Sequence, residues 1–141
     1  MKVLLDTCII IDTLQNRIPF SHASNEIFMM TAENKCEFYI SAKSITDIYY
    51  LTHKITHSKE ATKNIIRKIL MLFNILDTTA VDCKNAIYSE TNDYEDAVMI
   101  ESALRESFDC IVTRNIDDYK NDSIIIYKPD DFVNLIENMI N

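Results

Sequence analysis

The sequence predicts an α/β fold, with a parallel β-sheet of about five strands covered by helices on both faces. Two observations carry this prediction: short apolar runs typical of buried strands recur along the chain, and stretches with helical periodicity separate them. The runs are Val3–Leu5, Phe38–Ile40, Phe73–Leu76, Cys110–Val112 and Ile124–Tyr127. Parallel strands have right-handed connections, and their ligands bind outside the carboxyl ends of the strands, where we expect a site.

Helices are expected between and after these strands, and several begin with a Ser, Thr or Asp that can cap the first turn. Their expected ranges are Ser21–Asn34, Ser41 to about Lys54, Ser58–Leu72, Thr79 to about Ser89, Asp93–Glu106 and Asp130–Met139, with a further helix beginning near Thr7. The chain has 141 residues, 48% of them apolar, which suits one domain over residues 1–141.

Composition excludes several classes of protein. The chain has no glycine, so the glycine-rich loops that bind nucleotide phosphates in P-loop and dinucleotide-binding proteins are excluded. No apolar run is long enough to span a bilayer, and Asp6 interrupts the apolar start, so we expect a cytoplasmic protein with no membrane contact. The net charge of −8 argues against a general basic surface for nucleic acid, but a carboxylate-rich site would also produce it.

Two aspartates stand at informative places in the first half of the chain. Asp6 directly follows the predicted strand Val3–Leu5, where it either caps the next helix or projects into a site at the sheet edge. Asp47 lies beside the apolar stripe of the helix expected from Ser41, although aspartate is a poor residue for a helix interior. Asp12 is expected at a solvated position of the first helix.

Further polar side chains occur at corresponding places in the second half. Asp93 and Asp96 are three residues apart at the start of a helix, where one can cap the helix and both lie near its positive end. Thr113 and Asn115 follow the predicted strand Cys110–Val112.

The predicted topology directs these acidic segments toward one end of the sheet. Two carboxylates 4 Å apart repel by about 4 kcal/mol at an effective dielectric constant of about 20, so a tight cluster requires a bound cation or a shared proton. Ligands that are all oxygen suit Mg²⁺ or Mn²⁺, which also bind substrate phosphate. Hydrolysis of phosphodiesters is therefore the expected chemistry.

In their order and spacing, these segments resemble the PIN domain, particularly the VapC-like toxin ribonucleases of toxin–antitoxin systems. The segments that carry the resemblance are Leu4–Cys8, Ser41–Leu51, Asp93–Ala97, Ile111–Asn115 and Asp118–Tyr119. The resemblance implies a three-layer α/β/α sandwich and a metal-dependent endoribonuclease that uses one or two Mg²⁺ or Mn²⁺ ions.

The resemblance also implies roles for particular residues. Asp6, Asp47 and Asp96 match the metal-binding acids, Asp93 matches an additional acid, and Thr113 and Asn115 match polar groups beside the metal. Asp47 stands where many members have Glu, and Asn115 where some have Asp; whether Asn115 or Asp118 completes the site stays open.

The resemblance implies an RNA substrate, a cognate antitoxin and a possible homodimer. Two alternatives differ in class. One is a PIN-like module that binds RNA or protein without cutting. The other is a haloacid-dehalogenase-like phosphatase, which needs D-x-D after the first strand, where Cys8 occupies the second acidic position. Arg105 and Arg114 lie in or near the segments that flank the predicted site, where they either contact phosphate or offset carboxylate repulsion.

Overall fold

A computed structural model describes residues 1–119 and 123–141. In these residues, five parallel strands form one sheet in the order β3-β2-β1-β4-β5. The strands are β1 (Lys2–Leu5), β2 (Glu37–Ser41), β3 (Asn74–Leu76), β4 (Cys110–Val112) and β5 (Ile125–Tyr127). The predicted strands are confirmed, with ends displaced by one residue at most. The central strand is β1, so Asp6 leaves the middle of the sheet.

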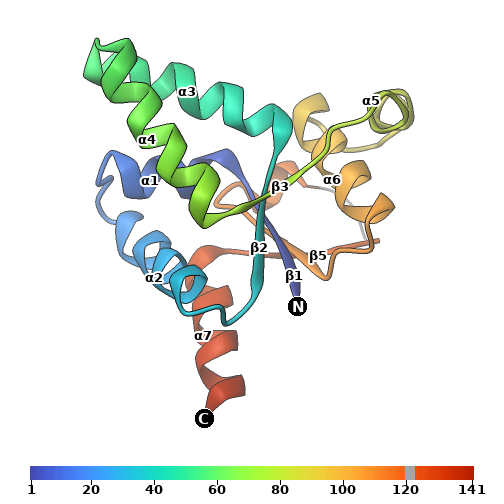
Figure 1. Ribbon diagram of the computed structural model, residues 1–141. Coiled ribbons are helices and arrows are strands. Elements are labelled where there is room, and N and C mark those ends of the chain that lie inside the picture. Colours follow the sequence, from blue (N-terminus) through green and yellow to red (C-terminus); the bar gives the residue numbers. More distant parts are fainter. Residues whose placement is uncertain (120–122) are drawn as a thin grey trace.

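Helices surround the sheet on both faces, which confirms the predicted α/β sandwich (Figure 1). Their bounds are α1 (Thr7–Leu14), α2 (Ser21–Ala32), α3 (Ala42–Thr56), α4 (Lys59–Leu72), α5 (Ala80–Ala86), α6 (Tyr94–Arg105) and α7 (Pro129–Ile140), with a 3₁₀ turn, η1, at Ile116–Asp118. Each helix begins within one residue of its expected start, whereas α5 ends three residues before the expected Ser89.

The strands face two separate apolar clusters because successive side chains point to opposite faces. Val3 and Leu5 of β1 pack with α1, α2, α3, α4 and α7, whereas Leu4 packs with α6 on the other face. Helix α5 does not join either cluster directly and packs on α6 through Ala86 and Ala97. The sheet is therefore covered by many helices on one face and mainly by α6 on the other.

Caps fix where the helices of the sheet edge begin. Asp6 caps α1, Ser41 caps α3 and Asp93 caps α6, each through a side-chain oxygen that accepts a backbone N–H. Asp6 directly follows β1 and Ser41 ends β2, so the starts of α1 and α3 lie at the carboxyl edge of the sheet.

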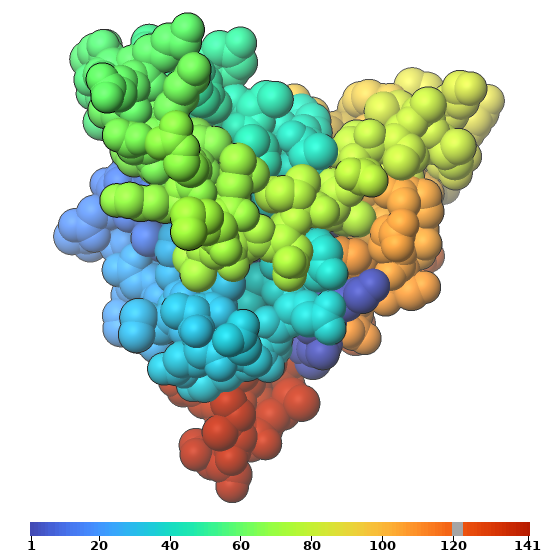
Figure 2. Space-filling view, viewed as in Figure 1, coloured from blue at the N-terminus to red at the C-terminus, as the bar shows by residue number. Residues whose placement is uncertain are grey.

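The α3–α4 pair and the region of α5 form two projections of the surface with a notch between them (Figure 2). Helices α3 and α4 pack against each other, and α5 packs against α6. No helix in the described part of the chain is both long and apolar enough to cross a bilayer.

Candidate active site

A cavity of about 470 Å³ lies at the carboxyl edge of the sheet, beside the starts of α1 and α6 and one face of α3. Five of the six residues predicted for the site line it, together with two further acids. These seven are Asp6, Asp47, Asp93, Asp96, Asn115, Glu95 and Asp118. The predicted convergence of acidic side chains at this edge therefore occurs.

Asp6 is held in place by two hydrogen bonds at the end of β1. Its Oδ1 accepts the backbone N–H of Thr7 at 2.7 Å, and its Oδ2 accepts the hydroxyl of Thr113 at 2.7 Å. Only 8% of the residue is exposed. Burial raises the pKa of the Asp6 carboxyl, and the hydrogen bonds from Thr113 and Thr7 oppose this increase. Both interpretations of Asp6 hold, because the residue caps α1 and also lines the cavity.

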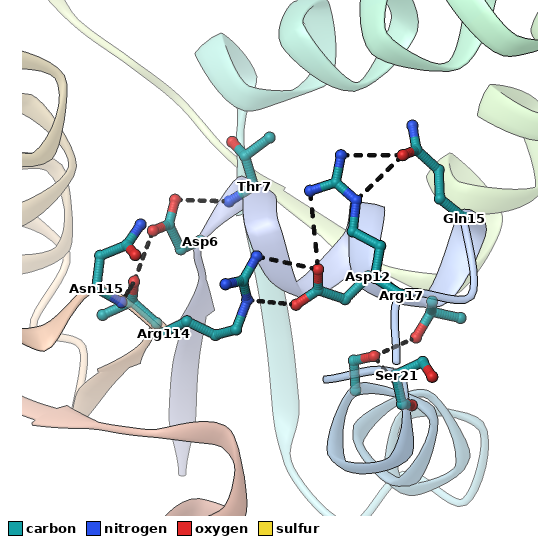
Figure 3. Close-up of polar contacts among 11 residues, drawn as sticks. Asp6, Thr7, Asp12, Gln15, Arg17, Ser21, Arg114 and Asn115 are labelled. Carbon is teal, nitrogen blue, oxygen red and sulfur yellow. Dashed lines mark hydrogen bonds and ion pairs between the residues drawn. The ribbon is translucent and has the colours of Figure 1, made fainter. Parts of the chain in front are cut away.

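Thr113, the sixth predicted residue, lies beneath the cavity. It is fully buried, and its Oγ1 also accepts the backbone N–H of Asn115 at 3.1 Å. Asn115 is exposed and lies near Asp6 in the close-up (Figure 3). Thr113 therefore connects the end of β4 to the end of β1 and fixes the turn that presents Asn115.

Asp96 lies in the first turn of α6 and is half-buried. Burial, together with the negative charges of Asp6 and Asp93, raises its pKa to about 7. Burial and nearby carboxylates both disfavour the charged form of this carboxyl group. Such a site gains free energy from a proton or a cation.

Tyr119 is the buried hydroxyl of this cluster. The hydroxyl donates to Met99 Sδ at 3.7 Å, and its proximity to Asp6 and Asp96 lowers the pKa of both carboxyls against the larger effect of burial. Burial and these two carboxylates raise the pKa of Tyr119 itself, so it stays protonated and available as a donor. Sequence reasoning assigned Tyr119 no role, and its place after Asp118 in the resemblance was the only signal.

Asp47 lines the cavity but already has a cationic partner. Lys43, one turn earlier on α3, places its Nζ 2.6 Å from Asp47 Oδ2 and 2.8 Å from Glu95 Oε2. The lysine therefore links α3 to α6 through two acids that line the cavity. Its spacing of four residues from Asp47 was a signal in the sequence that was not used.

Comparison with known sequences decides the family. A profile described as the PIN domain matches residues 2–117. The chain belongs to the PIN-domain family. A comparison with curated protein sequences gave no match.

Solved structures share the fold of this PIN domain. A chain of a toxin–antitoxin complex from Klebsiella pneumoniae is 20% identical with a TM-score of 0.67, covering 90% of this chain and 97% of that chain. A chain of VapBC2 from Rickettsia felis, bound to a promoter DNA fragment, is 19% identical with a TM-score of 0.68, covering 91% of this chain and 98% of that chain. The toxin VapC20 from Mycobacterium tuberculosis, described as cleaving the sarcin–ricin loop, is 10% identical with a TM-score of 0.60. This match covers 77% of this chain and 86% of VapC20.

The oxygen ligands of this PIN domain suit a divalent cation. In the described residues, no three His, Cys, Asp or Glu side chains are close enough to form a metal cage. Mg²⁺ does not need such a cage, because it binds proteins through one or two carboxylates and keeps several waters. Asp6 and Asp96 line the same cavity, and the negative charge of Asp6 contributes to the raised pKa of Asp96, so the two carboxylates act on each other.

The expectation that Asp12 is solvated is wrong. Asp12 is 1% exposed, and Arg114 Nε lies 2.6 Å from its Oδ2. Figure 3 shows Asp12 between the side chains of Arg114 and Arg17. Arg114 also lies over the ring of Phe20, with 4.0 Å from Cζ to the ring centroid. Arg114 therefore neutralises the buried Asp12 carboxylate, which does not line the cavity, and not the acids of the predicted site.

Arg105 does not line the site cavity. Its Nε lies 3.0 Å from Oδ1 of Asp82, a buried residue at the start of α5. Ser102 also donates to Asp82, and Thr79 shares a capping box with it. Although burial raises the pKa of Asp82, the Arg105 pair and these hydrogen bonds outweigh it and lower the pKa overall. Arg105 offsets a carboxylate, but one that joins α5 to α6.

Proposed function

We propose that this PIN domain is a metal-dependent endoribonuclease that hydrolyses RNA phosphodiester bonds, and that it is the toxin of a toxin–antitoxin pair. One observation carries the proposal above the others. Asp6 and Asp96 line one cavity at the carboxyl edge of the sheet, where burial raises the pKa of both carboxyls and the negative charge of Asp6 adds to the increase for Asp96. This arrangement favours a hard cation and, through it, a substrate phosphate.

Each side chain has a separate task in this proposal. Asp6 and Asp96 hold Mg²⁺ or Mn²⁺, and Asp47 and Asp93 assist. When bound, the cation supplies an activated water and stabilises the charge that develops on the phosphate. Thr113 acts as a positioning residue because its hydroxyl fixes the Asp6 carboxylate.

Asn115, Asp118 and Lys43 also have roles in this proposal. Asn115 and Asp118 line the cavity, where their oxygens and the Asn115 amide orient water or substrate. Asp47 joins the metal only after it leaves Lys43, which favours a weak second metal position. Released from Asp47, the Lys43 ammonium group is available to the substrate phosphate.

The phosphatase alternative is the weaker enzyme reading. It needs a second carboxylate two residues after Asp6, and Cys8 occupies that position. Burial and the negative charge of Asp6 raise the pKa of the Cys8 thiol to about 12, so the thiol is protonated at neutral pH. A protonated thiol does not replace the second carboxylate that the phosphatase needs.

The non-catalytic module has one observation in its favour, since Lys43 already neutralises Asp47.

The nuclease proposal also includes partners and a location. The similar folds in complexes described as toxin–antitoxin support a cognate antitoxin protein that covers the acidic cavity. A homodimer and a cytoplasmic location are also proposed.

The test compares wild-type protein with Asp6→Asn on a mixed RNA pool in Mn²⁺, Mg²⁺ or EDTA. Asparagine keeps the helix cap, so loss of cutting is not a loss of folding. Asp131→Asn is the matched control, because Asp131 is an exposed acid of α7. We expect cutting with metal by wild-type and the control alone. Absence of cutting together with no rise in thermal stability on adding metal contradicts the proposal and favours the binding module.

A further inference from the structure

The cavity has a second side whose chemistry differs from that of the acids. Arg17, Tyr50, Leu51 and Ile11 line the same cavity as the carboxylates. Arg17 is the one basic residue among the described residues that line it. A cation and an aromatic ring therefore border the acidic cluster, and the proposed metal chemistry uses neither.

Tyr50 presents its ring on the face of α3 that carries Asp47. The two residues are three apart, so they lie on neighbouring positions of one helix face. Tyr50 is 67% exposed even though it borders the cavity. Its ring packs edge-on against Tyr49, with centroids 5.8 Å apart, and Tyr49 stacks on His53 at 6.3 Å. The exposed ring is therefore supported from one side and open on another.

Arg17 is likewise supported at the rim of the cavity. Its Nε and Nη2 donate to Gln15 Oε1 at 3.1 and 2.9 Å, and its Nη1 lies 4.0 Å from Asp12 Oδ1 (Figure 3). Because Asp12 is already paired with Arg114 at 2.6 Å, the longer contact leaves the Arg17 charge only partly compensated. A guanidinium held in this way suits a phosphate.

We propose that Tyr50 and Arg17 form a nucleotide subsite beside the acidic cluster, with an unpaired base on the Tyr50 ring and a flanking phosphate on Arg17. The inference rests on the proposed nuclease function and names the form of its substrate. The faces of a base inside a duplex are covered by its neighbours, so a side-chain ring can stack only on a base that is unstacked. The site therefore takes RNA that is single-stranded next to the cut.

A nucleic acid fits these observations better than a protein segment does. The platform is one ring and one cation, and Leu51 is only half-buried beside them. Stacking on a single aromatic ring combined with a phosphate contact is how proteins bind single strands. A docked protein segment remains as an alternative outcome of the test.

The test measures binding of two fluorescein-labelled RNA octamers by anisotropy in Mg²⁺. One is an adenylate octamer and the other is an abasic octamer with the same phosphates. The host protein is Asp6→Asn, which we expect not to cut. We expect the adenylate octamer to bind about 5- to 150-fold more tightly than the abasic one, the range that stacking of one base supplies. Tyr50→Phe keeps this ratio, and Tyr50→Ala lowers it at least several-fold.

Arg17→Gln gives a different pattern, because it removes a phosphate contact and no base contact. Both octamers should weaken by the same factor, and the slope of log affinity against log salt should fall by about 0.7. Tyr88→Ala is the control, since Tyr88 is 87% exposed and does not line the cavity. It should change neither the ratio nor the slope.

The outcomes separate this inference from the nuclease proposal. If wild-type protein cuts RNA but Tyr50→Ala leaves the binding ratio unchanged, the subsite is overturned and the nuclease stands. If that variant keeps the ratio and instead loses a co-purifying protein, the occupant is a protein and the subsite is again overturned. If the host binds neither octamer with metal and wild-type protein does not cut, both proposals fail.

Discussion

Asp12 and Arg114 form a bidentate ion pair, with Nε 2.6 Å from Oδ2 and Nη2 3.1 Å from Oδ1. Asp12 belongs to α1, and Arg114 stands between Thr113 and Asn115 after β4. The pair therefore joins the helix that Asp6 caps to the turn that carries the polar groups of the site. Both ends of this link act on the position of Asp6, one through α1 and the other through Thr113.

Replacing Asp12 should destabilise the whole molecule. Asp12→Ala leaves the Arg114 guanidinium without its buried partner, and breaking one side of a buried pair costs roughly 3–5 kcal/mol. We expect a loss of this size in the free energy of unfolding, measured by urea denaturation. Asp131→Ala on the surface of α7 should change it by less than about 0.5 kcal/mol. A loss of under about 1 kcal/mol for Asp12→Ala would show that the pair contributes little.

Two substitutions of Asp6 should separate catalysis from folding. Asp6→Ala removes both the cap and the metal ligand, and loss of a cap costs about 0.5–2 kcal/mol. Asp6→Asn keeps a capping oxygen toward Thr7, and its amide can donate to Thr113 Oγ1. Both variants should lose RNA cutting, but only Asp6→Ala should melt earlier than wild type. Retained cutting by Asp6→Asn would remove Asp6 from the metal site.

The metal-free protein should lose stability as the pH rises. Asp96 has an ordinary pKa of 3.8 and a folded value of about 7, so the folded state binds the proton more tightly. Its contribution is fully present below about pH 4 and is lost as the pH rises through about 7. In EDTA, the melting temperature should fall over this window, and less so in Asp96→Asn. An identical pH dependence in the two proteins would contradict the assigned cause.

The parts predictable from the sequence were those set by local pattern. Apolar runs and caps located the strands and helices, and parallel topology then brought Asp6 and Asp96 together. Asp12 was placed wrongly because its partner Arg114 is 102 residues away, and only the fold brings them into contact. A helical pattern predicts which side of the helix a residue occupies. It does not identify a distant residue, such as Arg114, whose charge stabilises a buried carboxylate.

Lys43 illustrates a different limit. Its spacing from Asp47 was visible, but the second acceptor, Glu95, comes from α6, and only the fold brings Glu95 within 2.8 Å of Lys43. Exposed lysine–carboxylate pairs contribute little to stability. The main consequence of the Lys43 pair is therefore that it neutralises Asp47, an acid that lines the cavity.

Removing Lys43 should strengthen metal binding. In Lys43→Met, Asp47 and Glu95 lose their shared cation, so the cavity becomes more negative. Asp47 then binds the metal ion without first breaking its ion pair with Lys43. We expect a lower dissociation constant for Mn²⁺ by isothermal titration calorimetry and a larger rise in melting temperature on adding Mn²⁺. Lys63→Met, an exposed lysine of α4, is the matched control and should behave as wild type. Mn²⁺ binding that is unchanged or weaker in Lys43→Met would show that Asp47 takes no part in the metal site and that the ion pair is its permanent state.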